Sequence, residues 1–306
     1  MILVWLPYEE AVARMGGLPD GLRAEVWDGS GPWPDSVGDV QLYVLPYMVG
    51  DRAFAPLPHM ARLRVLQTLT AGYDNVLPLL PDGVTLCNAG GVHDASTAEL
   101  AVGLVLASLR GFPGFVRAAD EGRWAAAPRP ALADRTVLIV GYGSVGAAVE
   151  RRLAGFEVTV LRVARTAREA VAGQVDGLDR LPALLSEADV VVLCLPLTPA
   201  TTGLVGADFL ARMRDGALLV NVARGAVVDT DALVAELATG RITAALDVTD
   251  PEPLPPGHPL WSAPGVLISP HVGGNTSAFL PRAYRLLADQ LGLFATGQPL
   301  QHVVRP

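Results

Sequence analysis

The chain has 306 residues, of which 51% are hydrophobic and 18% are charged, and this is the composition of a globular protein long enough for two domains. The formal net charge of −8 argues against a nucleic-acid partner and gives no sign of attraction to a membrane. All 23 basic residues are Arg, which excludes a mechanism that needs a catalytic lysine.

The first 94 residues alternate short apolar runs with helical or loop segments. Strands are expected at residues 2–6, 40–45, 63–68 and 85–87, with residues 11–15 and 52–60 between them. Strands that alternate with helices predict a parallel sheet. The N-terminal apolar run ends at Pro7 and is too short for a signal-peptide core or a membrane span, so we expect no targeting segment there.

A long buried helix is expected to follow. Residues 96–99 (STAE) form a capping box ahead of an apolar run, which predicts a helix from residue 97 to about residue 110 that joins the two domains. The apolar stretch 100–109 is about half as long as a membrane span, so it is interpreted as a core helix. Residues 111–114 (GFPG) interrupt it, and a second helix is expected to run to about residue 121.

The glycine-rich segment that follows carries the strongest motif. An apolar strand at residues 136–140 leads into Gly141, Gly143 and Gly146, a G-x-G-x-x-G pattern, and then into a helix at 147–153 and a strand at 157–161. The first glycine permits a sharp turn, the second lets a pyrophosphate approach the backbone, and the third lets helix and strand pack closely. The helix N-terminus offers N–H groups to the phosphates. The pattern predicts a dinucleotide site.

Further alternation is expected after this unit. Helices are predicted at residues 181–188, 208–213, 231–240 and 281–295, and strands at 189–194, 217–222, 242–248 and 266–269. In open parallel sheets, ligands bind outside the carboxyl ends of the strands. Arg224, Glu252 and His271 lie just beyond three of these strands, so we expect them at the cofactor edge.

These residue types fit one reaction. An arginine holds a carboxylate bidentately, and a histidine is the usual proton donor near neutral pH. A carboxylate beside that histidine fixes its tautomer and favours its protonated form. With a nicotinamide, the set predicts hydride transfer to a 2-oxo acid, with His271 protonating the new alkoxide. A solvated loop position for Glu252 and a surface position for Arg224 are the alternatives.

Histidine assignments leave one question open. His59, His258 and His302 lie in Pro-flanked loops or near the terminus and are expected to be solvated. His93 lies in a loop after a strand and before the capped helix, so it is either a site residue or a structural one. Cys87 and Cys194 occupy apolar, strand-like runs without a C-x-x-C pair, which predicts buried free thiols, a reducing cytoplasmic compartment and no metal site.

Several motifs together resemble the D-isomer-specific 2-hydroxyacid dehydrogenases, in the glyoxylate/hydroxypyruvate reductase-like branch. They are residues 69–76 (LTAGYDNV), 141–146, 195–198 (LPLT), 221–225 (NVARG), 252–254 with 258–260, and 269–274 (SPHVGG). The resemblance implies an α/β fold of two doubly wound parallel-sheet domains, a Rossmann cofactor domain at 95–274 inserted into a flavodoxin-like substrate domain of residues 1–94 plus 275–306. It also implies a homodimer formed through the cofactor domain, and no regulatory domain is expected after residue 306.

The resemblance also assigns roles. It implies that Arg224, Glu252 and His271 are catalytic, that Arg224, His271 and the backbone amides near Ala71 and Gly72 hold the substrate, and that Asp247 binds the nicotinamide amide. The expected cofactor-binding residues are Gly141, Gly143, Ser144, Val145, Gly146, Arg162, Arg165, Thr166, Leu195, Pro196, Thr201, Val222, Ala223, Asp247 and Gly273.

The cofactor is expected to be NADP, with NAD possible. An NAD site usually has Asp or Glu at the end of its second strand, about 20 residues beyond the first glycine. Arg162 stands there, followed by Arg165 and Thr166, and a guanidinium pairs with a 2′-phosphate that a carboxylate would repel. The alternative is that these arginines are solvated surface charges.

Two other functions remain open. One is a non-catalytic dinucleotide sensor that binds a partner protein, against which the complete trio argues. The other is a phosphoglycerate-type dehydrogenase, which needs a second anion site, and no additional Arg cluster lies near residues 70–75 to supply one. The substrate is therefore expected to be a small 2-oxo acid such as glyoxylate or hydroxypyruvate.

Overall fold

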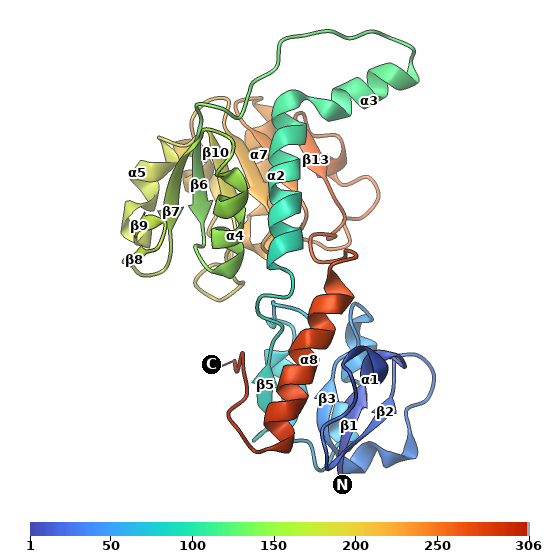
Figure 1. Ribbon diagram of the computed structural model, residues 1–306. Coiled ribbons are helices and arrows are strands. Elements are labelled where there is room, and N and C mark those ends of the chain that lie inside the picture. Colours follow the sequence, from blue (N-terminus) through green and yellow to red (C-terminus); the bar gives the residue numbers. More distant parts are fainter. Residues whose placement is uncertain (305–306) are drawn as a thin grey trace. The chain divides into compact units, whose positions relative to one another are not determined.

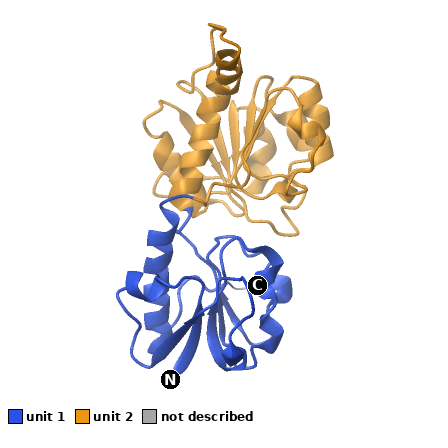
Figure 2. Cartoon of the chain, turned by 90° about the vertical axis from the view of Figure 1, so that its right-hand side faces the viewer, with its two compact units in different colours: residues 1–93, 276–306 blue, residues 94–275 orange. Residues whose placement is uncertain are grey.

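The computed structural model describes residues 1–304 and divides into two compact units (Figure 2). One unit consists of Met1–His93 together with the segment that begins at Thr276, and the other consists of Asp94–Asn275. These limits lie within one residue of the domain boundaries expected from the sequence. The first unit is therefore built from two separate stretches of chain.

Unit 1 (residues 1–93 and 276–304) is a parallel sheet with strands in the order β2-β1-β3-β4-β5 (Figure 1). This order is the flavodoxin-like one. Its strands are β1 (Ile2–Leu6), β2 (Leu22–Val26), β3 (Val40–Val44), β4 (Val65–Gln67) and β5 (Thr85–Cys87). Its helices are α1 (Ala11–Arg14) and α8 (Phe279–Ala295), with short 3-10 turns at Asp35–Asp39, Gly50–Phe54, Leu57–His59 and Leu77–Leu79.

Both faces of this sheet are buried. Along β1, Val4 and Leu6 pack into the cluster that contains α8, whereas Leu3 and Trp5 pack into the cluster on the opposite face. This alternation follows from the two-residue period of a strand. It explains why the run is continuously apolar, as a strand covered on both sides must be.

Strand β2 is absent from the sequence-based prediction. Its sequence, LRAEV, carries Arg23 and Glu25, which form an ion pair at 2.6 Å on the exposed side. It is an edge strand of unit 1, and charged side chains are common at sheet edges because they discourage pairing with other chains. A search for apolar runs cannot find such a strand.

Unit 2 (residues 94–275) is built on a six-stranded parallel sheet in the order β13-β12-β11-β10-β6-β7. Its strands are β6 (Thr136–Val140), β7 (Thr159–Val163), β10 (Val190–Leu193), β11 (Leu218–Asn221), β12 (Thr243–Leu246) and β13 (Val266–Ile268), and a separate hairpin joins β8 (Arg168–Ala170) to β9 (Gly173–Val175). A single parallel bridge, Val163 to Asp176, stands where a further strand would extend the sheet beyond β7. The resulting order is that of a Rossmann sheet with its third strand reduced to one bridge.

The helices of unit 2 cover both faces of this sheet, as an α/β fold requires (Figure 1). They are α2 (Asp94–Arg110), α3 (Phe112–Asp120), α4 (Ser144–Leu153), α5 (Leu181–Leu185), α6 (Ala207–Arg212) and α7 (Thr230–Ala238), with 3-10 turns at Leu178–Arg180, Gly225–Val227 and Pro259–Trp261. The predicted α/β class is confirmed, and most elements lie within two residues of their expected ends.

Several predicted boundaries in unit 2 are wrong, and one of them is the end of helix α5, which lies at Leu185, three residues before the predicted end. Helix α2 begins at Asp94, so Ser96 is buried inside the helix and is not its N-cap. Helix α4 begins at Ser144, directly after the second glycine of the motif, rather than at residue 147. Strand β7 begins two residues later than expected because Glu157 has a positive φ of 56° and belongs to the preceding turn.

The shift in β7 changes the position of one predicted cofactor residue. With the strand running from Thr159 to Val163, Arg162 lies inside it and not beyond its end. The residues that follow the strand are Ala164, Arg165 and Thr166, and the last two are exposed.

No single helix among residues 1–304 is long and apolar enough to cross a membrane. Helices α2 and α3 pass that test only as a pair, and they are bent by 64° at Gly111.

Cys87 is buried and Cys194 is half-buried, and both are free. Burial raises the pKa of both thiols, to about 12 for Cys194, as expected for unreactive core cysteines.

Candidate active site

The three glycines of the motif differ in what surrounds them. A Cβ on Gly141, whose φ is +101°, would lie 2.6 Å from the carbonyl carbon of Cys194, and one on Gly146 would lie 2.4 Å from the Gly141 oxygen. A Cβ on Gly143 would meet nothing within 4 Å. The first and third glycines are therefore required by packing, and the second leaves open space in which a pyrophosphate can approach the backbone.

Helix α4 presents its N-terminus to that space. Gly143 is its N-cap and supplies no side-chain hydrogen bond. In the part of the chain that the structure describes, the amides of Ser144, Val145 and Gly146 have no hydrogen-bond acceptor. Unpaired amides at the positive end of a helix dipole bind phosphate, so the loop and helix fit a dinucleotide.

The loop after β10 lies against the glycine loop. The backbone nitrogen of Leu195 is 2.8 Å from where a Gly141 Cβ would stand, and Leu195 itself is buried. The hydroxyl of Thr201 donates to the Pro196 carbonyl at 2.7 Å and accepts from the Thr198 amide at 2.8 Å. This fixes the loop at the point where the strand order reverses between β6 and β10, which is where ligands bind in such sheets.

Arg162 is engaged within β7. Its Nε donates to Glu150 on α4 at 2.8 Å and its Nη2 forms a second bond to the same carboxylate, which also accepts from the Tyr142 hydroxyl. Burial raises the pKa of Glu150, but the hydrogen bonds from Arg162 and Tyr142 outweigh it and leave that pKa below its ordinary value. Arg162 is thus held by a carboxylate, while Arg165 and Thr166 extend from the loop beyond it.

A further arginine reaches the glycine loop from the hairpin. The Arg168 side chain in β8 donates to the Tyr142 carbonyl at 2.5 Å, between the first two glycines of the motif. The sequence-based prediction did not include Arg168, because the hairpin that turns it back toward Tyr142 leaves no clear periodic signal.

The turn after β11 is organised by Asn221, which is buried. Its side-chain oxygen accepts from the Ala223 amide at 3.0 Å, and its side-chain nitrogen donates to the Arg224 carbonyl at 3.0 Å. An Asn that bonds the backbone two residues ahead forms an Asx-turn. This turn buries Val222 and Ala223 and leaves Arg224 half-buried, with its Nη1 donating to the Ala223 carbonyl.

Asp247, at the end of β12, shapes the turn that carries His271. Its carboxylate accepts from the Ser269 hydroxyl at 2.7 Å and from the Val272 and Gly273 amides, each at 2.9 Å. Its backbone carbonyl accepts from the His271 amide, and His271 has a φ of +52°. The expected contact between Asp247 and a nicotinamide amide stays a prediction. A carboxylate has about four acceptor sites, and the three bonds named here leave one for such a contact.

His271 is paired with Glu252. The His271 Nδ1 lies 2.5 Å from the Glu252 Oε1, and the two side chains are 34% and 39% exposed. Because a carboxylate only accepts, Nδ1 carries the proton of this bond and Nε2 remains for a ligand. Two residues 19 positions apart are brought together because their strands end at the same edge of the sheet.

In unit 1, Ala71 and Gly72 lie in the half-buried loop after β4. Neither amide donates a hydrogen bond within residues 1–304. His93 is a buried side chain of the same unit, and its Nε2 lies 2.7 Å from the Leu69 carbonyl. Its ring stacks on Tyr47 and Phe279, with centroids 5.6 and 5.2 Å away, so the structure favours the structural interpretation of His93.

The other histidines lie apart from this chemistry. His59 and His302 are exposed, whereas His258 is half-buried and its Nδ1 accepts from the Leu260 amide at 3.2 Å, which corrects the expectation that it is solvated.

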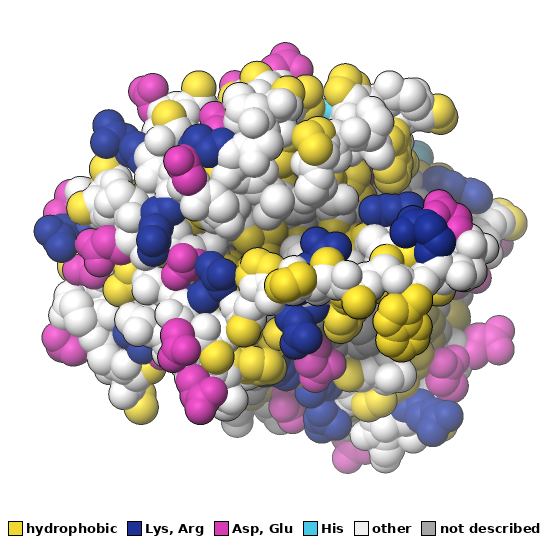
Figure 3. All heavy atoms as spheres, turned by 90° about the horizontal axis from the view of Figure 1, so that it is seen from above, with side chains coloured by type: hydrophobic (Ala, Val, Ile, Leu, Met, Phe, Trp, Pro, Cys, Tyr) yellow, Lys and Arg dark blue, Asp and Glu magenta, His cyan; other side chains and the backbone are white. Residues whose placement is uncertain are grey.

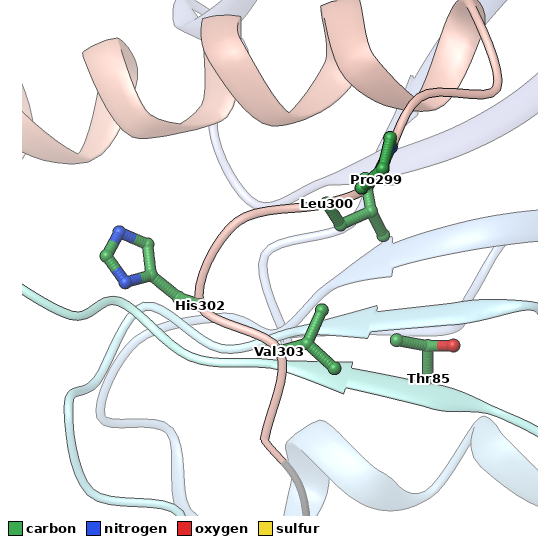
Figure 4. Close-up of a pocket in the computed structure, with 5 residues that line it drawn as sticks. All are labelled: Thr85, Pro299, Leu300, His302 and Val303. Atoms are coloured by element: carbon green, nitrogen blue, oxygen red, sulfur yellow. The ribbon is translucent and has the colours of Figure 1, made fainter.

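A cavity of about 580 Å³ in unit 1 is lined by Thr85, Pro299, Leu300, His302 and Val303 (Figure 4). It lies at the amino end of β5, carries no expected site residue and has no charged side chain.

A family model described as the NAD-binding domain of D-isomer-specific 2-hydroxyacid dehydrogenases matches residues 102–273, more than half of the chain. The chain belongs to this family. This dehydrogenase is 37% identical to the mouse (Mus musculus) glyoxylate reductase/hydroxypyruvate reductase over 270 residues, which cover 83% of this chain and 82% of the relative. The family resemblance drawn from the motifs is confirmed.

Solved structures are similar over the whole chain of this dehydrogenase. A D-isomer-specific 2-hydroxyacid dehydrogenase from Xanthobacter autotrophicus Py2, in complex with NADPH and MES, is 32% identical with a TM-score of 0.83, and the match covers 100% of this chain and 98% of that one. An NADPH-dependent glyoxylate/hydroxypyruvate reductase from Sinorhizobium meliloti, in complex with NADP and sulfate, is 27% identical with a TM-score of 0.84 over 99% and 97%. The chain is an NAD(P)-dependent oxidoreductase that uses a nicotinamide dinucleotide.

Proposed function

We propose that this dehydrogenase reduces a small 2-oxo acid, of the glyoxylate or hydroxypyruvate type, to the D-2-hydroxy acid with NADPH. The observation that carries the proposal is the Glu252–His271 pair at the cofactor edge of unit 2. The names of the mouse and Sinorhizobium relatives support the substrate class. On the face drawn in Figure 3, arginine side chains are interspersed with acidic ones and form no continuous basic field.

The chemistry of the pair suits this reaction. The bound nicotinamide supplies a hydride to the carbonyl carbon. Protonated His271 donates its Nε2 proton to the oxygen that becomes the hydroxyl, and Glu252 stabilises the imidazolium through Nδ1. Arg224 suits the substrate carboxylate, which a planar guanidinium binds bidentately. In unit 1, the Ala71 and Gly72 amides also suit an anionic carboxylate.

The preference for NADPH rests on the loop beyond β7. No Asp or Glu stands between the strand end and Arg168, whereas Arg165 and Thr166 are exposed there. A 2′-phosphate would find guanidinium and hydroxyl donors and no opposing carboxylate. Arg162 contributes less directly than its position in the sequence suggests, because Glu150 already holds it. We therefore assign the phosphate contact to Arg165 and Arg168, with Thr166 beside them.

A homodimer is part of the proposal. Helix α3 and the segment after it expose Phe112, Phe115, Val116 and Trp124, the last at 96%. Large exposed apolar side chains this close together are typical of an interface. The two free cysteines support a reducing compartment, such as the cytoplasm.

The direct test is turnover. Purified protein is mixed with NADPH or NADH and a panel of 2-oxo acids, and nicotinamide absorbance reports reduction. We expect reduction of glyoxylate or hydroxypyruvate, higher kcat/KM with NADPH, and no large gain for a 3-phosphorylated substrate. Binding of NADPH without turnover of any 2-oxo acid would instead support a dinucleotide sensor.

A further inference from the structure

The loop of residues 69–72 in unit 1 has every one of its carbonyl groups bound. The Leu69 carbonyl accepts from the His93 ring at 2.7 Å. The Thr70 carbonyl accepts from the Thr68 hydroxyl at 2.8 Å and from the Ala89 amide at 2.9 Å. The remaining two carbonyls accept from the Asn88 side chain and from the Thr70 hydroxyl, each at 2.7 Å. A loop this short with all its acceptors satisfied has one preferred backbone orientation.

That orientation determines where the amides point. The carbonyl of one residue and the amide of the next belong to one planar trans peptide, and they point in opposite directions. When Asn88 holds the Ala71 carbonyl, it turns the Gly72 N–H the other way. Likewise, the bonds to the Thr70 carbonyl turn the Ala71 N–H outward. Neither amide has an acceptor among the described residues, so both remain available to an anion.

Asn88 is itself held by a network of neutral groups. Its side-chain oxygen accepts from the Gly90 amide at 3.3 Å, and its backbone carbonyl accepts from Gln67 at 3.1 Å. Gln67 is 1% exposed and accepts from Gln290 of α8 at 2.8 Å. Buried polar side chains are costly unless paired, and these are paired. The network therefore links α8 to the loop without placing a charge near the two amides.

The C-terminal segment completes this support. The backbone N–H of Asn88 donates to the His302 carbonyl at 3.1 Å, and Cys87 forms an antiparallel bridge with Val303. Figure 4 shows this segment running alongside β5. Asn88 is thus fixed through both its backbone and its side chain, which leaves its Nδ2 directed at the Ala71 carbonyl.

We propose that Asn88 is a positioning residue for the substrate carboxylate. It sets the orientation of the Ala71–Gly72 peptide, so that the Gly72 amide meets the carboxylate without reorganisation. This rests on the proposed function, since it takes the substrate to be a 2-oxo acid. A group that acts this way affects substrate binding and leaves proton transfer and cofactor binding unchanged.

The test compares Asn88→Ala with the wild type, using the 2-oxo acid that the wild type reduces best. We expect KM to rise about tenfold, the value of one hydrogen bond to a charged group, with kcat changed by less than about threefold. The dissociation constant of NADPH, measured by nicotinamide fluorescence, should not change. The preference for the acid over its methyl ester, which lacks the anionic carboxylate, should fall by a similar factor.

Two further variants keep the result interpretable. Asn88→Asp preserves size but replaces the donor with an acceptor, so it should raise KM at least as much as Asn88→Ala. Tyr43→Phe removes a buried bond to the Ala53 carbonyl elsewhere in unit 1, and it should lower stability without changing KM or the acid-to-ester ratio. An Asn88→Ala or Asn88→Asp variant with an unchanged KM and ratio overturns the inference, whereas a wild type that reduces no 2-oxo acid overturns the proposed function instead.

Discussion

The two parallel sheets end in different chemistry at their carboxyl edges. In unit 2, the residues beyond the strands present charged or titratable side chains, namely Arg224, Glu252 and His271, and buried polar groups such as Asn221 and Asp247 shape the turns that carry them. In unit 1, the residues beyond β4 present backbone amides, and the uncharged side chains of Thr70 and Asn88 hold the Ala71 and Gly72 carbonyls. In the proposed function, similar topology therefore serves two different tasks, proton transfer in unit 2 and carboxylate binding in unit 1.

The difference follows from what each edge has to do. Proton transfer needs a group that titrates, and only a side chain supplies one. Binding a carboxylate does not need a group that titrates. Oriented amides bind a carboxylate without a counter-ion that would itself need solvation. The proposed division assigns reaction to unit 2 and part of substrate recognition to unit 1, and variants at each edge should affect different kinetic constants.

The largest effect is expected from His271→Ala. The variant removes the proposed proton donor and leaves the glycine loop intact, so kcat should fall by about 10²–10⁴-fold while NADPH affinity stays within about twofold. Stopped-flow absorbance and a fluorescence titration measure the two quantities. His59→Ala, at an exposed histidine of unit 1, is the matched control. Near-normal turnover in His271→Ala would assign proton donation to another group.

Replacing Arg165 and Arg168, which follow β7, should alter cofactor choice. In Arg165→Ala combined with Arg168→Ala, the ratio of kcat/KM for NADPH to that for NADH should fall by about 10–100-fold, because a 2′-phosphate loses charge-assisted hydrogen bonds. Arg180→Ala, elsewhere in unit 2, serves as control. An unchanged ratio, or a wild type that prefers NADH, would contradict the assignment. The kcat with the better cofactor should otherwise persist, which distinguishes the effect of these two arginines from the loss of kcat in His271→Ala.

Glu252→Gln should slow reduction. The His271 Nδ1 lies 2.5 Å from the Glu252 Oε1, and a carboxylate there makes a charge-assisted hydrogen bond that a neutral amide does not, so kcat should fall by roughly tenfold. Stopped-flow absorbance measures the rate. Glu169→Gln, at an exposed position in β8, should leave kcat unchanged. If Glu252→Gln keeps the wild-type kcat, Glu252 does not act on His271.

The parts of this site that the sequence predicts are those that depend on strand order alone. Residues 136–140 have the same limits in prediction and structure, and Arg224, Glu252 and His271 could be placed at one edge because parallel strands end together. The parts that it does not predict depend on contacts across the fold. Nothing in the sequence near Asn88 indicates a bond to Ala71, 17 residues away.

Arg162 illustrates the same limit. Counting from Gly141 places it at the end of the strand, but a positive-φ residue at Glu157 moves the strand two positions along. Glu150, on a different element, then determines what the guanidinium contacts. Asn221 and Ser269 lie within the recognised motifs, yet their roles in holding the turns became evident only from their hydrogen bonds.

The smallest effect is expected from Glu150→Gln, which tests whether Arg162 is a structural cation. The pKa of Glu150 is lowered in the folded protein, so the ionised carboxylate contributes stability at neutral pH. This stability is lost as the pH falls through the folded-state pKa. At pH 7 the variant should be less stable by about 1–2 kcal/mol, the value of a hydrogen-bonded charge. The difference should shrink as the pH falls through the folded-state pKa of Glu150, where the wild-type carboxylate also becomes neutral. Thermal unfolding across this range measures the difference in stability, with Glu169→Gln as control.

A loss of stability that does not depend on pH would show that shape, and not charge, holds Arg162. A gain in NADPH preference would show that the freed guanidinium reaches the cofactor, and Arg162 would then join Arg165 and Arg168 at the phosphate.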